Sequence, residues 1–320
     1  HGTNNTEAVV EKSGEKNNKI SNGKSISVKA SDTSSEKAVA GSVSVATGQK
    51  AMATLGGAVS YNNIGNSAAD KQHVTAKLSD TDITTADAGT VNVLAENNAR
   101  LLNLALGGAV RAGSGSMGVS GQGSVAATTL YSDTYAGMQN VTVAKDEKVS
   151  KKANVTVKAD NQSQVTNSAD AFAVSAGTEG QIAFGGAVST IKSDADTRTE
   201  LKQSQFTVDD LTAQAVSANK TLNIGIGLSV GASGTSVGGS VAGNVASNKI
   251  ENDTTVSVDG VTVAADDTVA VLADSQETMQ NYGGAVSVGA SGGGGGAAGG
   301  TTIVTNTISG NTEANVSNSN

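Results

Sequence analysis

Apolar and polar residues alternate strictly in a short block that occurs five times along the chain. Each block ends in alanine and has the period of two that is typical of a half-buried β-strand. Strand centres fall near Val28, Val43, Val59 and Val74, about one per fifteen residues. No stretch shows a convincing helical period. The five blocks cover residues 26–30, 91–95, 155–159, 211–215 and 269–273.

A second signature, Gly-Gly-Ala-Val or Gly-Gly-Ser-Val, also returns five times. Signatures that return along a chain indicate a repeat, in which each unit buries its apolar side against its neighbours. We expect Ala187, beside one of the glycine pairs, to lie in a slot that admits only small side chains. The copies are at 56–59, 107–110, 185–188, 238–241 and 283–286.

An Asp-Thr or Asn-Thr pair marks one point of each unit. The first residues of the pairs are Asn5, Asp133, Asp196, Asp253 and Asn311, and Asp70-Lys71 is a degenerate copy. We therefore predict a single elongated domain over residues 5–320, with residues 1–4 as a tag or linker remnant. Its five repeats are 5–69, 70–132, 133–195, 196–252 and 253–310, and 311–320 begins a sixth.

These patterns predict an all-β fold, and two architectures fit them. In a parallel β-helix, or β-solenoid, each coil hydrogen-bonds to the next, and the absence of proline keeps that ladder unbroken. The alternative is a stack of antiparallel β-hairpins, because the stretches from Val43 to Val59 and from Leu228 to Val241 each look like strand, turn and strand. With two to three coils per repeat, the helix would be a rod of roughly 50 to 70 Å.

The composition indicates a thin core and an uneven surface. The 320 residues include 40 glycines, only 2% aromatic residues, and neither cysteine, proline nor tryptophan. Residues 221–248 and 282–310 carry no charge, whereas the segments around the Asp-Thr markers hold most of the acids and lysines. Stacked in register, such repeats would form a neutral Ser/Thr/Gly face and a charged, solubilising face.

Few residues offer catalytic or metal-binding chemistry. His73 is the only internal histidine and cysteine is absent, so a zinc site or a Ser-His-Asp triad lacks partners. Three pairs of acids have the chemistry to bind calcium or cleave a glycosidic bond, but a solvated polar loop is the favoured interpretation. The pairs are Asp80 with Asp82, Asp209 with Asp210, and Asp266 with Asp267.

Other short motifs are incomplete. The five glycines at 292–296 lack the Lys-Ser/Thr pair of a phosphate-binding loop, and Lys151-Lys152 is too short for a nucleic-acid patch on a chain of net charge −8. The sequons at Asn154 and Asn252 are interpreted as chance matches. We assign no catalytic, cofactor-binding or metal-binding residue, and we expect neither nucleic-acid binding nor a membrane-embedded segment.

The combination of Gly-Gly-Ala-Val-Ser, Val-x-Val-x-Ala and Asp-Thr motifs over residues 5–320 resembles the repeats of leukotoxin-type filamentous adhesins. These are type V secreted, autotransporter-like virulence proteins on the surface of Gram-negative bacteria, with β-helical passengers. The resemblance implies a passenger segment at the extracellular surface, with its outer-membrane transporter outside this segment. It transfers no functional residue, because the repeat motif is structural.

We therefore expect a non-enzymatic stalk that presents an extended face to a host-cell receptor or a polymeric glycan, without a cofactor. The alternatives are a polysaccharide-degrading β-helix enzyme and part of a secreted toxin. An enzyme of that class needs inserted loops and aromatic platforms for sugars, and the repeats show neither.

Overall fold

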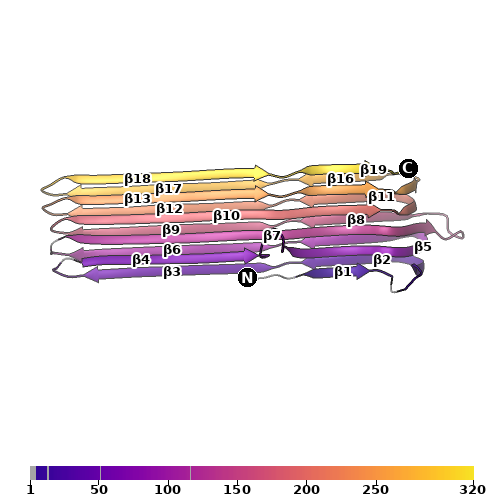
Figure 1. Cartoon of the computed structure of the whole chain (residues 1–320), viewed down its shortest axis with the longest axis horizontal. Coiled ribbons are helices and arrows are strands. Elements are labelled where there is room, and N and C mark those ends of the chain that lie inside the picture. The colour runs from indigo at the N-terminus through magenta and orange to yellow at the C-terminus, as the bar shows by residue number, and fades with distance from the viewer. Residues whose placement is uncertain (1–4, 13, 51, 116) are drawn as a thin grey trace.

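The computed structural model describes residues 5–12, 14–50, 52–115 and 117–320, and every regular element in these segments is a β-strand. The strands form two sheets in parallel register (Figure 1). The predicted tag at residues 1–4 lies outside the described residues. Sheet B has five strands: β3 (Ser35–Thr47), β6 (Arg100–Gly113), β9 (Gln164–Gly177), β12 (Lys220–Ser233) and β17 (Thr278–Ser291). Sheet A has 14: β1 (Thr6–Val10), β2 (Asn18–Asp32), β4 (Met52–Ile64), β5 (Gln72–Asn97), β7 (Gly118–Lys145), β8 (Ala153–Asn161), β10 (Gln181–Lys202), β11 (Gln205–Ser217), β13 (Gly238–Glu251), β14 (Thr254–Asp259), β15 (Thr262–Ala265), β16 (Val269–Ser275), β18 (Gly296–Ser309) and β19 (Thr312–Ser317).

The chain runs through both sheets and returns beside its starting strand several times, each time one strand further along the stack. Each such passage is called a coil below. In one central coil, β10 runs along sheet A, the chain turns back into β11, and β12 continues in sheet B. Residues 234–237 then lead into β13, which pairs in parallel with β10. The prediction of an all-β structure with parallel strands is confirmed, and the arrangement is compatible with a β-helix.

The antiparallel hairpin alternative is wrong for the described strands. β3 and β4 follow one another along the chain, as do β12 and β13, but the two members of each pair belong to different sheets. They therefore pack face to face instead of exchanging backbone hydrogen bonds. The ladders between the named strands of both sheets are parallel, and each joins one coil to the next.

The expectation of two to three coils per repeat is also wrong, because one repeat forms one coil. Thr134, Thr197 and Thr254, each from an Asp-Thr marker, are direct register partners in successive coils. The long dimension of the molecule consequently follows the strands, and the coils stack across it at about 4.8 Å each (Figure 1). The predicted rod of 50 to 70 Å along the stack does not form over this segment.

One end of the molecule, called the charged end, contains β1, β2, β5, β8, β11, β14–β16, β19 and the final parts of β7 and β10. It lies on the right in Figure 1. Its interior is filled by medium-sized aliphatic side chains such as Leu78, Val93 and Leu201. Its corner is a column of left-handed residues with φ from 48° to 64°: Asp80, Asn140, Gln203, Gly260 and Asn318. Asn, Asp and Gly tolerate this conformation best, so four of the five residues suit the corner.

The other end, called the glycine-rich end, contains β3, β4, β6, β9, β12, β13, β17, β18 and the first parts of β7 and β10. Here the two sheets approach so closely that a Cβ at Gly185 would collide with the backbone of Leu228, and one at Gly227 with that of Gly243. Alanines fill what space remains, and Ala187 is 2% exposed. The expected narrow slot is therefore present, and glycine is required where backbone faces backbone.

An asparagine column holds the two sheets of this end together. Asn103, Asn167, Asn223 and Asn281 are register partners on sheet B and point into the slot. Their side-chain amides donate to backbone carbonyls of sheet A, for example from Asn167 Nδ2 to the oxygens of Ala126 at 3.0 Å and Thr190 at 2.9 Å. These bonds supply the cross-sheet specificity that small apolar side chains alone do not provide.

Candidate interaction surface

The outward positions of the glycine-rich end carry large apolar side chains. On sheet A, one column of register partners is Val59, Val125, Val188, Val245 and Ile303. Val59 is 71% exposed and Ile303 is 52% exposed. The expected neutral Ser/Thr/Gly face is therefore wrong in composition: small and polar residues face the slot, whereas valine, leucine, isoleucine and phenylalanine face outward.

Sheet B has the same inverted pattern on its outer side. Along β12 the residues with inward side chains include Asn223 and Ser229, and the alternate positions hold Ile224, Ile226 and Leu228. Isolated exposed apolar residues are common, but apolar side chains in register across several strands form a continuous patch. Such patches mark surfaces that bind other molecules.

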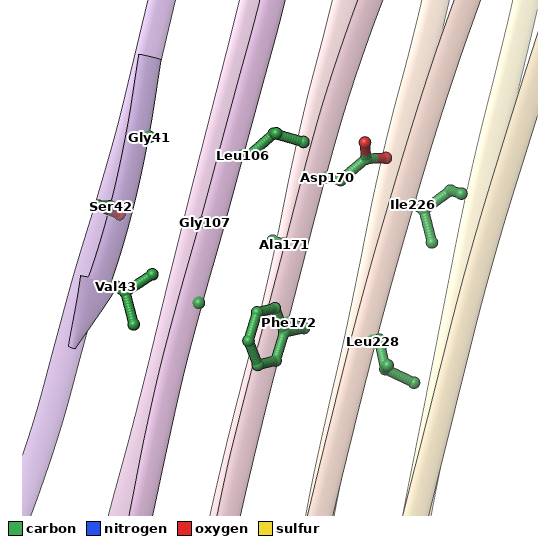
Figure 2. Close-up of a pocket in the computed structure, with 11 residues that line it drawn as sticks. Gly41, Ser42, Val43, Leu106, Gly107, Asp170, Ala171, Phe172, Ile226 and Leu228 are labelled. Carbon is green, nitrogen blue, oxygen red and sulfur yellow. The ribbon is translucent and has the colours of Figure 1, made fainter. Parts of the chain in front are cut away.

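A groove of about 560 Å³ crosses this outer side of sheet B (Figure 2). Gly108 is part of its lining and stands between Val43 and Phe172 in one register column. The Phe172 ring leans over Gly108 and occupies the place of a side chain there, because a Cβ on Gly108 would lie only 2.6 Å from the ring Cζ. Leu106, Ile226 and Leu228 supply further apolar lining.

Asp170 is the only charged residue among the described residues that line the groove. It stands between Leu106 and Ile226 in the register column, as Figure 2 shows. One carboxylate oxygen accepts a hydrogen bond from the Ser168 hydroxyl at 3.0 Å. The other oxygen is shielded from solvent and has no hydrogen-bond partner among the described residues. Desolvation raises the pKa of this carboxyl above its usual value, against the opposing effect of the Ser168 hydrogen bond.

Replacing Asp170 with asparagine is expected to stabilise the protein at pH 7. Because the folded-state pKa is raised, the unfolded chain releases its proton first, and stability falls as pH rises from about 4 through the folded-state pKa. The amide has no charge to desolvate, so the variant lacks this loss. Urea midpoints measured at pH 3 and pH 7 check this: the advantage of the variant should disappear at pH 3, and an equal advantage at both values would contradict it.

At the charged end, the residues singled out in the sequence take part in structural contacts. His73 Nδ1 lies 3.4 Å from Asp133 Oδ2, and Arg198 donates to both oxygens of the same carboxylate. Lys71 Nζ lies 2.5 Å from an oxygen of Asp194 and 2.8 Å from an oxygen of Asp196. The sequence did not predict this contact, because Lys71 belongs to an earlier coil and is more than 120 residues away from both acids. Lys71 and Arg198 therefore form ion pairs with carboxylates of other coils.

The three predicted acid pairs also connect coils. Asp80 accepts a hydrogen bond from Asn140, Asp210 from the backbone of Thr268, and Asp266 pairs with Lys152. Within the described residues, no group of three or more His, Cys, Asp or Glu side chains is arranged to hold a metal ion. One acid of each pair therefore has a structural partner in another coil.

The remaining motifs lie in ordinary positions. Residues 292–295 form the turn between β17 and β18, and the Lys151 backbone N–H donates to Asp87. Asn252 of one sequon is buried and accepts a 2.7 Å hydrogen bond from the backbone of Ala195. Asn154 of the other sequon is exposed on β8.

No helix in the part of the chain that the structure describes has the length and apolarity to cross a lipid bilayer. Comparison of the chain with protein-family models, with curated proteins and with solved structures finds no match.

Proposed function

We propose that this chain is a non-enzymatic stalk segment of a large bacterial surface adhesin, folded as a β-solenoid and exported to the cell surface by an outer-membrane transporter. The parallel ladders support a shaft, because each coil is hydrogen-bonded along its length to its neighbours. A longer array of the same repeats would extend along the stacking direction by about 4.8 Å per coil. The motif resemblance supports the export and surface location.

The observation that carries the attachment role is the recurrence of exposed apolar residues at equivalent positions of successive coils. The column from Val59 to Ile303 places one outward aliphatic residue in each of five coils, and all of them except the half-buried Val245 are exposed. A partner that spans several coils gains contacts from each one, so its affinity increases with their number. Aliphatic columns of this kind favour a host protein over a polymeric glycan, because protein interfaces bury apolar side chains at their centres.

An enzymatic role has less support. Several acids of the charged end are engaged with Lys71, Arg198 or Lys152, and the described residues that line the groove include a single carboxylate. Glycoside cleavage ordinarily uses two carboxylates on opposite sides of the scissile bond. No specific observation favours the toxin alternative.

Deletion of residues 196–252 tests the attachment role. The deletion removes one coil and joins Ala195 to Asp253, whose neighbour Thr254 is the register partner of Thr197, so the path of the chain is preserved. We expect beads coated with the variant to show graded loss of adhesion to cultured epithelial monolayers, and a variant in which 196–252 is duplicated to show a gain.

Far-UV circular dichroism establishes that both variants fold. Complete loss of adhesion in a folded deletion variant would indicate a local site, and adhesion independent of coil number would contradict a distributed face. Failure of the intact chain to adhere at all would overturn the attachment role. Release of reducing ends from a polysaccharide, abolished by Asp194→Asn with Asp196→Asn, would establish the enzyme alternative instead.

A further inference from the structure

The groove on sheet B combines an apolar lining with one incompletely satisfied carboxylate. Val43, Leu106, Phe172, Ile226 and Leu228 line it, and Figure 2 shows their side chains around Asp170. They come from β3, β6, β9 and β12, which are neighbours in the sheet and belong to four successive coils. The volume of about 560 Å³ falls in the range of small-molecule sites, roughly 300 to 1,000 Å³.

One oxygen of the Asp170 carboxylate lacks a hydrogen-bond donor from the described part of the protein. Ser168 satisfies one oxygen, and the other has no protein donor among the described residues. A desolvated carboxylate with one oxygen lacking a donor is unfavourable, and a cation placed beside the carboxylate stabilises its charge most effectively. Among the described residues, no lysine, arginine or histidine lines the groove, so a counter-cation would come from a bound molecule.

We propose that this groove binds an amphiphilic organic cation, with its aliphatic chain along the apolar columns and its ammonium group paired with the Asp170 carboxylate. The apolar lining contacts the aliphatic chain of the ligand, and the carboxylate pairs with its positive charge. An uncharged or anionic molecule of the same length would therefore gain only the apolar contacts. The ligand is a small single-chain molecule, because Asp170 is enclosed between Leu106 and Ile226 in its column. This site is independent of the proposed adhesive role and requires neither export nor a host partner.

Calorimetric titration of the intact chain at neutral pH with decylammonium, 1-decanol and decanoate, each below its aggregation limit, tests the proposal. We expect decylammonium to bind at least about tenfold more tightly than decanol, which is the low end for a charge-assisted hydrogen bond. Decanoate should bind least, because its carboxylate repels Asp170. Equal affinity for the three probes, or no binding of decylammonium, would overturn the proposal.

Two variants separate the charge from the apolar lining. Asp170→Asn keeps the shape of the side chain and should reduce decylammonium affinity to that of decanol, without changing decanol binding. Phe172→Ser should weaken both probes alike, and Thr166→Val, on the same strand but outside the groove lining, should change neither. Retention of the full decylammonium preference by a folded Asp170→Asn variant would place the cation elsewhere and refute the assignment. Adhesion of Asp170→Asn to epithelial monolayers, measured in parallel, distinguishes failure of this site from failure of the attachment role.

Discussion

Replacing Gly231 with alanine is expected to destabilise the protein by at least about 3 kcal/mol. A Cβ at this position would overlap the carbonyl oxygen of Gly239 on the opposite sheet and lie 2.7 Å from its carbonyl carbon. Because the obstacle is backbone, no side-chain rotation relieves the clash, and the two sheets have to separate. The loss is a large fraction of the 5–15 kcal/mol that stabilises a typical domain. The urea midpoint of unfolding, followed by far-UV circular dichroism, measures it.

Gly243→Ala is the matched control. Gly243 lies on β13 in the same end of the molecule, but its missing side chain would point into open space, with no atom within 4 Å. Alanine there is expected to be neutral or slightly stabilising, within about 0.5 to 1 kcal/mol, because glycine loses more backbone entropy on folding. Similar midpoints for the two variants would show that close approach of the sheets is not what requires glycine at position 231.

The strands and their parallel register follow from features visible in the sequence. The Asp-Thr marker is informative because its two side chains have different roles: Thr254 points into the core, whereas Asp253 points outward and accepts a hydrogen bond from the backbone of Asn311 in the next coil at 2.8 Å. The Gly-Gly-Ala-Val signature is less informative. Its copies lie on both sheets, and Gly185 pairs with Ala242 instead of Gly238, so they are not equivalent positions.

The size of the coil was not predictable from local patterns. Short alternating blocks suggest short strands and small coils, but β7 runs through 28 residues and β10 through 22. Polar residues between the blocks, such as Ser193 and Thr197 on β10, continue the strand with inward side chains. Hydrogen bonding to the neighbouring coil keeps the backbone extended through these polar residues. That neighbour is distant in sequence, so a short stretch of sequence does not distinguish a polar part of a strand from a turn.

The sequence did not predict the interaction surface, because alternation shows that two sets of side chains lie on opposite faces of a strand but does not show which set faces the core. In β12, as in ordinary half-buried strands, apolar and small or polar residues alternate, and the larger apolar set is normally assigned to the core. At the glycine-rich end the close approach of two backbones excludes large side chains, so Ile224 and Ile226 face outward and Gly225 faces inward. The useful signal was the alternation of glycine with large aliphatic residues at 224–231.

Two other features of this end gave no local signal. Arg111 is the only charge between residues 101 and 132 and is fully buried, although an isolated arginine is ordinarily a surface residue. The position of Asp170 in the groove depends on Leu106 and Ile226, which are 64 and 56 residues away. Both environments are set by register between coils, which a local window does not contain.

Replacing Asn167 with leucine is expected to cost about 2 to 3 kcal/mol, although the substitution adds apolar character to a buried position. Asn167 Nδ2 is within hydrogen-bond distance of the carbonyl oxygens of Ala126 and Thr190 and of Asn223 Oδ1, and its own oxygen accepts from Thr128 at 3.2 Å. Leucine offers neither donor nor acceptor, so the Thr128 hydroxyl and the neighbouring amide lose partners inside a slot that excludes water. Leucine also branches where the opposite sheet is close.

Thr166→Val serves as the comparison, because the adjacent residue on β9 faces outward and its substitution should change stability by no more than about 0.5 kcal/mol. A second comparison, Asn167→Asp, keeps the size and one acceptor but removes the amide donor, and should destabilise at neutral pH at least as much as leucine, because a carboxylate would be buried without a cationic partner. Urea midpoints of the three variants show whether Asn167 stabilises the protein through its hydrogen bonds or through its packing. If leucine matched the wild type while aspartate did not, the asparagine column would be tolerated by the fold without stabilising it.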